Sequence, residues 1–318
     1  MGQDYKLNTR QPAPDYFGKI FLHEIFMVAL FLQITARLLI AGHAWSWILA
    51  YLCVFAIYAL LIRQGIKTLS PLINRVRLLW NIILMNFAFT SIRYIIPLLG
   101  KNPLDSHLAK IDSWIVGKDL SIWAQQIYCK PLTEIMSIGY MLFIVFLFST
   151  FFIYAFKADL NKLCRFCFGI FTLYAFGITG YSIVPAQGPL VYLAGAYSCN
   201  LEGYAFTELN RMMVSFGSSG YDVFPSLHAG VGLFLLLFYR EHDRSFYYVY
   251  MLPFIILVLS TIYLRYHYLI DVLVGLPLAV LCYCIGEWAF QNLQTVNEIY
   301  SQYCDASEIN AIKEDTCT

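Results

Sequence analysis

The chain has 318 residues, of which 59% are hydrophobic and only 13% are charged, against the roughly 25% charged residues of a soluble domain; its mean hydropathy is +0.63. Twenty-one basic and 20 acidic residues leave a formal charge of +1, so the chain lacks the basic surface that neutralises a nucleic-acid backbone. This composition excludes an ordinary cytosolic enzyme and a nucleic-acid partner. It predicts an all-α, polytopic transmembrane helix bundle, and the 17% of aromatic residues is typical of rings at lipid and headgroup depth.

The first 19 residues are polar and contain Pro12 and Pro14. They do not match a secretory signal and predict a cytoplasmic N-terminal tail. The long apolar segments that follow approach the roughly 20 residues needed to span a bilayer. They are 20–41, 45–62, 78–99, 132–156, 164–184, 223–239, 247–265 and 268–290.

We expect 6–8 spans, because the first segment contains His23, Glu24 and Arg37 and the sixth is short. Together these apolar segments predict a single transmembrane domain over 20–290, with a catalytic core over 132–290. A cytoplasmic C-terminal tail follows over 291–318.

With eight spans and a cytoplasmic N-terminus, 13 of the 21 Lys and Arg residues fall in cytoplasmic segments and six fall outside. Cytoplasmic connections carry an excess of Lys and Arg, so the count supports this orientation.

The connection 100–130 contains Leu104, Leu108, Ile111 and Ile115 at helical spacing, with Asp105, Lys110 and Asp112 on other faces. This pattern predicts an amphipathic helix, either in the membrane interface or packed over the mouth of the bundle.

The nine cysteines lack the regular spacing of a disulfide framework. Cys164 and Cys167 have a C-x-x-C spacing, but no second pair or clustered histidine supports a zinc site. We interpret them as apolar positions on a helix.

Two stretches contain candidate catalytic histidines. Asp222 to His228 opens the sixth span; we expect Pro225 in the first helical turn and Ser218, Ser219 or Asp222 as its cap. The free N–H groups of such a helix start form a phosphate cradle, and His228 lies close to it.

In the second stretch, His267 and Asp271 have the i, i+4 spacing that places them on one helix face. A carboxylate that binds one ring nitrogen leaves the other nitrogen free to act as a nucleophile. In the predicted topology His228 and His267 share one side of the membrane and face each other across one pocket. The alternative is that these polar side chains only hold helices together.

These residues carry a resemblance to a known family. Pro225 to His228, then Ser260, then His267-x-x-x-Asp271 resemble the last two signature motifs of the type 2 phosphatidic acid phosphatase superfamily. Within it, the run 266–275 is most similar to the branch of inositol phosphorylceramide synthase and the sphingomyelin synthases. The resemblance implies that His267 forms a phosphohistidine, that Asp271 orients it and that His228 protonates the leaving alkoxide.

The resemblance also implies that Ser226 contacts the phosphoryl oxygens, and it demands neither a metal nor any other cofactor. The chain departs from the family's phosphatases at three places. The first motif lacks its Lys and Arg-Pro pair, where the chain has 180–189. The third motif reads Ser260-Thr261 instead of Ser-Arg, and Leu227 replaces a glycine.

A transferred phosphoryl group requires positive charge or oriented donors around its oxygens. The candidates to replace the missing cations are Arg265, Arg93 and Gln187, with Arg37 at similar depth. The alternative for each arginine is that its head group reaches for the interface.

The missing cations favour the transferase branch. We therefore expect a membrane-embedded phosphotransferase that moves a phospho-headgroup from a phospholipid donor to a lipid alcohol, at a site near the exoplasmic face. A lipid phosphate phosphatase that uses water as acceptor is the alternative. A transporter is less favoured, because it predicts broken helices in two related halves, and the sequence has no such symmetry. A CDP-alcohol lipid synthase would need a run of aspartates around a metal, which Asp105 and Asp112 do not supply.

Overall fold

The computed structural model describes residues 19–42, 44–68, 70–156 and 160–315. In these ranges the chain forms helices and no β-strand, and Ala186 and Asp222 make an isolated parallel bridge. The all-α expectation is confirmed. The long helices are α1 (Leu22–Ala41), α2 (Trp45–Thr68), α3 (Pro71–Leu98), α6 (Lys130–Phe156), α7 (Leu160–Ile183), α10 (Leu227–His242), α11 (Arg244–Tyr263) and α12 (Leu269–Asp315). The shorter ones are α4 (Asp105–Val116), α5 (Leu120–Ala124), α8 (Pro189–Tyr192) and α9 (Ala205–Gly217), with 3₁₀ turns η2 (Gln125–Ile127) and η3 (Ala194–Ala196).

Seven helices in the described part of the chain are long and apolar enough to cross a membrane: α1, α2, α3, α6, α7, α11 and α12. This number lies in the expected range, and the protein is an integral membrane protein. The expected sixth span, 223–239, corresponds to α10. It has 16 residues and a length of about 24 Å, which is short for a hydrocarbon core of about 30 Å.

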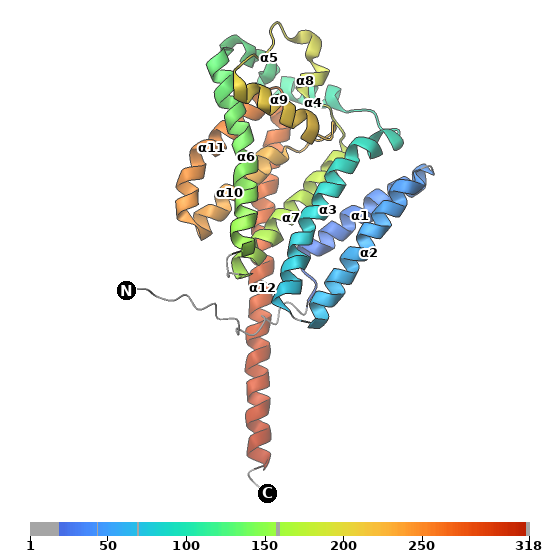
Figure 1. The fold of residues 1–318 in the computed structure, drawn as a ribbon, viewed down its shortest axis with the longest axis vertical. Helices are drawn as coiled ribbons and strands as arrows, with labels where there is room; N and C mark the ends of the chain where they lie inside the picture. Colours follow the sequence, from blue (N-terminus) through green and yellow to red (C-terminus); the bar gives the residue numbers. More distant parts are fainter. Residues whose placement is uncertain (1–18, 43, 69, 157–159, 316–318) are drawn as a thin grey trace.

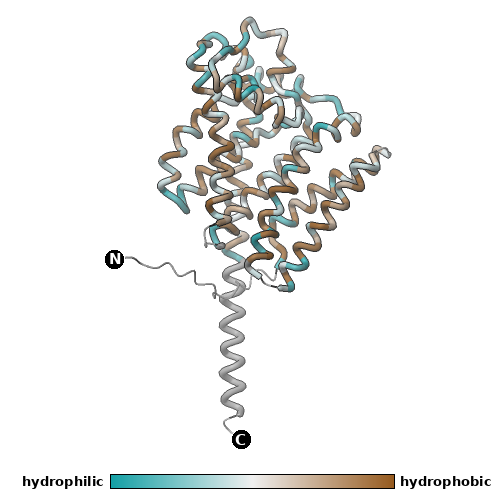
Figure 2. The backbone as a smooth tube through the Cα atoms, viewed as in Figure 1, coloured by the Kyte–Doolittle hydropathy of each residue, from teal (hydrophilic) through white to brown (hydrophobic). Residues whose placement is uncertain are grey.

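The helices α4, α5, α8 and α9 gather at one end of the bundle, and α12 projects beyond the opposite end (Figure 1). Hydrophobic residues follow the long helices, and hydrophilic residues lie mainly at the two ends of the bundle (Figure 2). Residues 291–315, which the sequence analysis places in the C-terminal tail, continue α12. The expected N-terminal tail falls outside the described residues except for Lys19.

Helix α7 is the enclosed centre of the bundle. Its most apolar window is 78% buried, against 17–44% for the other six spanning helices. Cys164 and Cys167 are fully buried on this helix, as the interpretation as apolar positions expects. Helix α12 approaches α7 so closely that a Cβ on Gly286 would lie 2.7 Å from the Gly169 Cα. Small residues of this kind allow the backbones of membrane helices to come together.

Two polar residues of the first span, Glu24 and Arg37, find partners inside the protein. Glu24 and Arg77 form a fully buried ion pair of 2.5 Å between α1 and α3, and Arg77 Nε donates a second bond to Glu24 at 2.6 Å. Arg37 donates to Ser182 of α7 at 3.0 Å. Such pairing offsets the cost of placing charged groups among apolar helices.

The amphipathic helix expected in 100–130 exists as α4, but its faces differ from the expectation. Leu108 is buried, whereas Ile111 and Ile115 are 38% and 39% exposed. Asp105 and Asp112, which we expected on other faces, are each 1% exposed. The correction has a physical reason: the two carboxylates accept backbone hydrogen bonds from the segments that α4 covers.

Candidate active site

The two predicted histidines lie together at the end of the bundle that α4 covers. His228 is the second residue of α10, and His267 lies in the turn 264–268 between α11 and α12. His267 Nε2 is 3.4 Å from His228 Nδ1, and the ring centroids are 5.6 Å apart. The sequence predicts that the two histidines face each other across one pocket. The fold brings them together, but the rings are in direct contact and tilted by 57°, and of the two only His228 lines the cavity described below.

A backbone carbonyl fixes the tautomer of His267. Nδ1 lies 3.0 Å from the Val223 carbonyl oxygen. A carbonyl oxygen only accepts, so the hydrogen-bond network assigns the proton to Nδ1. Nε2 then carries no proton, and its lone pair points toward His228.

Asp271 lies beside His267, as its spacing predicts, but it is not the nearest partner of the ring. Its Oδ2 is 3.5 Å from His267 Nδ1, farther than the Val223 oxygen, and it accepts a hydrogen bond of 2.7 Å from the Tyr268 N–H. Val223 therefore makes the closer contact with the imidazole. Asp271 instead holds the backbone next to the histidine.

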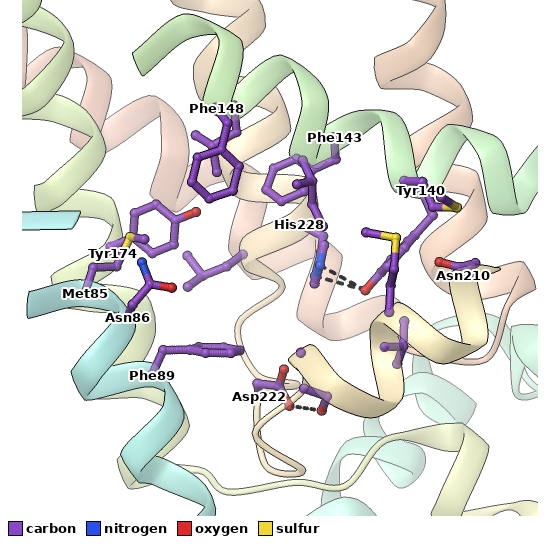
Figure 3. A pocket seen from close by; sticks show the side chains of 18 of the residues that line it. Met85, Asn86, Phe89, Tyr140, Phe143, Phe148, Tyr174, Asn210, Asp222 and His228 are labelled. Carbon is purple, nitrogen blue, oxygen red and sulfur yellow. Dashed lines mark hydrogen bonds between the residues drawn. The ribbon is translucent and has the colours of Figure 1, made fainter. Parts of the chain in front are cut away.

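His228 is enclosed by aromatic rings of α6. It stacks on Tyr140 with centroids 4.6 Å apart, and Phe143 lies at 5.2 Å (Figure 3). The Tyr140 hydroxyl is 2.9 Å from His228 Nε2. Because His267 Nε2 accepts, the consistent assignment is that His228 donates through Nδ1 and accepts from Tyr140 through Nε2.

The burial of His267 sets its protonation state. Burial lowers the pKa of His267 to about 4, and the Asp222 charge and the Val223 hydrogen bond oppose that shift only in part. The imidazole is therefore neutral at pH 7, which is the state that a nucleophilic nitrogen requires.

Helix α10 begins later than expected, and Ser226 is its N-cap. Ser226 Oγ accepts from the Ala229 N–H at 3.3 Å, and its own N–H donates to the Asp271 carbonyl at 3.0 Å. Pro225 therefore precedes the cap and is not part of the first helical turn, and the caps expected at Ser218, Ser219 or Asp222 are wrong. Ser226 is fully buried and joins α10 to the first turn of α12.

A cavity of about 210 Å³ extends from His228 between α3, α6, α7 and α9. Its walls are mostly apolar, with Phe89, Phe148 and Tyr174 among them, and Asp222 lies near the lower edge of the view (Figure 3). Ser218 donates to Asp222 at 2.7 Å. An apolar chain fits these walls when its polar end lies at His228.

Arg265 lines a second, polar cavity of about 360 Å³ together with Asn210 and Tyr266. Its guanidinium lies 3.7 Å over the Tyr197 ring and donates to the Cys199 carbonyl at 2.9 Å. The Nε of Arg265 and the Oδ1 of Asn210 are buried and have no hydrogen-bond partner among the residues that the structure describes. Arg265 thus retains a donor for a further group.

Arg93 and Gln187, two further expected phosphate ligands, make hydrogen bonds to segments distant in the sequence. Arg93 donates to the Ser218 carbonyl, and the Gln187 N–H donates to Asp105 at 2.9 Å. Within the described ranges, no hydrogen bond joins Arg93, Gln187 or Arg265 to either histidine.

Sequence reasoning missed Tyr140 and the Val223 carbonyl. Tyr140 follows a glycine inside a long apolar run, and a hydroxyl in such a run is a weak signal for a polar contact inside the bundle. A backbone carbonyl carries no sequence signal at all.

Comparisons with known proteins agree with the motif resemblance. The family model of the PAP2 superfamily matches residues 106–285. A PA-phosphatase related-family protein of Dictyostelium discoideum is 31% identical over 108 residues, which make up 33% of this chain and 20% of that protein. The chain therefore spans about a fifth of the length of that relative. No solved structure matches.

Proposed function

Because the chain belongs to the PAP2 superfamily, we propose that it is a lipid phosphotransferase that moves a phospho-headgroup from a phospholipid to a lipid hydroxyl through a phosphohistidine. Membership in this superfamily supports an enzyme of the phosphatase type that acts on lipids in the bilayer. The single observation that carries the proposal is the histidine pair, with a free Nε2 on His267 that lies 3.4 Å from Nδ1 of His228. The apolar cavity beside His228 supports a lipid substrate.

In the proposed first step, His267 Nε2 attacks phosphorus and the bond between phosphorus and the leaving lipid oxygen breaks. For this step His228 carries a proton on both ring nitrogens, a state that the bound anionic phosphodiester favours; it gives its Nδ1 proton to that oxygen and becomes neutral, so the donor lipid leaves as an alcohol. In the second step, His228 takes the proton of the acceptor hydroxyl. The acceptor oxygen then attacks phosphorus, and the bond between phosphorus and His267 breaks.

The phosphoryl oxygens need donors during both steps. Ser226, Arg265, Arg93 and Gln187 are the proposed ligands, and the unpartnered Nε of buried Arg265 supports Arg265 most directly. Asp271 has a proposed orienting role through the Tyr268 backbone.

The acceptor distinguishes two candidate functions. The absence of the phosphatase Lys and Arg-Pro pair from the sequence and the similarity of 266–275 to the inositol phosphorylceramide synthase branch favour a lipid alcohol. The relative, which is named as related to PA-phosphatase, favours water and hence a lipid phosphate phosphatase. The excess of Lys and Arg that the sequence predicts on the opposite side supports a proposed site at the exoplasmic face.

The test uses purified protein in mixed micelles with EDTA, a headgroup-labelled phospholipid and a fluorescent ceramide or diacylglycerol. We expect a new labelled lipid, and a water-soluble label alone would identify a hydrolase instead. His267→Ala is expected to abolish turnover, because no covalent step remains. His107→Ala is the matched control, since His107 is an exposed histidine of α4 at the same end of the bundle.

Turnover that His267→Ala leaves unchanged would contradict the nucleophile assignment. Dependence on added Mg²⁺ or Mn²⁺ would indicate a different phosphoryl chemistry.

A further inference from the structure

Helix α12 begins directly after His267 without a complete cap of its own. The first N–H groups of a helix have no partner inside the helix and need acceptors from elsewhere. Asp271 satisfies the Tyr268 N–H at 2.7 Å. The N–H groups of Leu269 and Ile270 need acceptors from elsewhere.

Asp112 of α4 supplies those acceptors. Its Oδ2 accepts from the Leu269 N–H at 2.6 Å and its Oδ1 from the Ile270 N–H at 2.9 Å. The two segments are more than 150 residues apart in the sequence. Asp112 is 1% exposed, so these charge-assisted bonds are shielded from water. A carboxylate at a helix N-terminus also interacts favourably with the helix dipole.

Asp105 holds the other side of the same turn. It accepts from the Tyr268 hydroxyl at 3.0 Å, from the Gly188 N–H at 2.8 Å and from the Gln187 N–H at 2.9 Å. The segment 187–190 also bonds the turn directly: the Leu190 N–H donates a hydrogen bond of 2.8 Å to the Arg265 carbonyl. Asp105 thus links Tyr268, the residue after His267, to the loop 187–190, which also bonds Arg265 before His267.

We propose that Asp105 and Asp112 are positioning residues that hold the His267 turn in its reactive geometry. The inference rests on the proposed role of His267 as nucleophile. A nucleophile must lie within a fraction of an ångström of its attack position. Here the two oxygens of Asp112 hold the backbone of Leu269 and Ile270, and Asp105 holds the Tyr268 hydroxyl. Neither aspartate touches the reacting atoms.

The exposed face of α4 supports this assignment. Trp114 is 87% exposed, and Ile111 and Ile115 are more than one third exposed. The helix therefore does not join the bundle through a continuous apolar stripe. Its two buried carboxylates contribute polar bonds to this connection: Asp112 to the backbone of Leu269 and Ile270, and Asp105 to the Tyr268 hydroxyl.

The test compares Asp112→Asn and Asp105→Asn with Asp119→Asn in the full-length protein. An Asn at position 112 keeps one acceptor oxygen but faces the second N–H with an amide NH₂. Asp119 is a matched control, because it caps α5 at the same end of the bundle through Ser121 and Ile122. For Asp112→Asn we expect kcat per folded molecule to fall by about 10- to 100-fold, with KM changed by less than about threefold, because the turn is displaced but the substrate cavity remains.

Hydrogen exchange of a peptide that covers 264–272 provides a second measurement that needs no turnover. We expect faster exchange in Asp112→Asn and unchanged exchange in Asp119→Asn. If Asp112→Asn fails to fold, Asp105→Asn and its exchange decide the question.

A folded Asp112→Asn variant with kcat within about twofold of the wild type, or with unchanged exchange over 264–272, would overturn the proposal. An equal loss in Asp119→Asn would also overturn it, because the effect would then be a general one on this end of the bundle. A wild type that turns over no lipid pair would contradict the proposed function alone. The exchange measurement would still decide whether Asp112 holds the turn.

Discussion

His267 combines a buried imidazole with a fixed proton. The Val223 carbonyl holds that proton on Nδ1 at 3.0 Å, and burial lowers the pKa of the ring to about 4. The neutral form is therefore stable well below pH 7. Ordinary histidines, with a pKa near 6.5, lose this form in mildly acidic solution.

The pH profile of turnover tests this arrangement. If neutral His267 is the nucleophile, kcat/KM is retained as the pH falls from 7 to about 5, and it is lost as the pH falls through about 4. Asp222→Asn removes a negative charge that raises the pKa of His267, so the acidic limb is expected to move to lower pH. The limb is measured on folded protein in micelles of constant composition.

Asp243→Asn serves as the control for this profile, because Asp243 lies at the opposite end of α10. A limb near pH 6.5, or a shift to higher pH in Asp222→Asn, would contradict the assigned state of His267.

At the scale of elements, the crossing of α10 and α12 positions the two histidines. The two helices meet where a Cβ on Gly275 would lie 2.4 Å from the Ser226 carbonyl oxygen. The Ser226 N–H donates to the Asp271 carbonyl at the same crossing. The absence of a side chain at Gly275 therefore allows the helix starts to share a hydrogen bond.

Gly275→Ala is expected to destabilise the protein by about 1–3 kcal/mol, because the added carbon must push backbone atoms apart. Thermal unfolding in micelles measures the change, and kcat is expected to fall with it because the crossing carries both histidines. Gly217→Ala in α9 is the matched control, since a Cβ there meets nothing within 4 Å. Equal unfolding temperatures for the two variants would argue against a tight crossing.

The sequence predicts the elements well where apolar periodicity is strong, and less well where a polar residue has a distant partner. The spans and the helix over 105–116 follow from hydropathy and spacing. Periodicity alone assigns Asp105 and Asp112 to solvent-facing positions. It misses their partners, which lie 82 to 163 residues away in the sequence. The predicted cap of α10 lies several residues too early for a related reason. The observed cap, Ser226, is held by a hydrogen bond to Asp271 of α12, a partner distant in the sequence.

At the scale of the whole molecule, the site lies at one end of the bundle, and α12 leaves the other (Figure 1). The motif prediction that His228 and His267 share an end depends on an even number of crossings between them. Helices α10 and α11 run between the two histidines and return the chain to the same end of the bundle, although α10 is not among the seven helices that are long and apolar enough to span a membrane. The total of seven spanning helices in the described ranges could not be fixed from hydropathy alone, because α10 lies at the limit of length.

Thiol labelling tests the orientation of the molecule. Cys129 is exposed and lies just before α6, at the end that contains the site. We expect a membrane-impermeant maleimide to label Cys129 in intact cells, because the proposed site faces the exoplasmic side. Glu241→Cys, near the far end of α10, is expected to react only after permeabilisation, as mass spectrometry of each peptide can show.

Cys129→Ser is the control that identifies the labelled peptide. Labelling of Glu241→Cys in intact cells while Cys129 stays unmodified would reverse the orientation.

The hydrogen-bonded row from Tyr140 through His228 and His267 to the Val223 carbonyl has a thermodynamic consequence for the proposed reaction. One proton leaves His228 with the first alcohol and one returns from the second, so the row ends each cycle as it began. The phosphodiester formed resembles the one broken, and the protein itself supplies no driving force. The direction of net transfer is then decided by the relative amounts of the two alcohols in the surrounding leaflet.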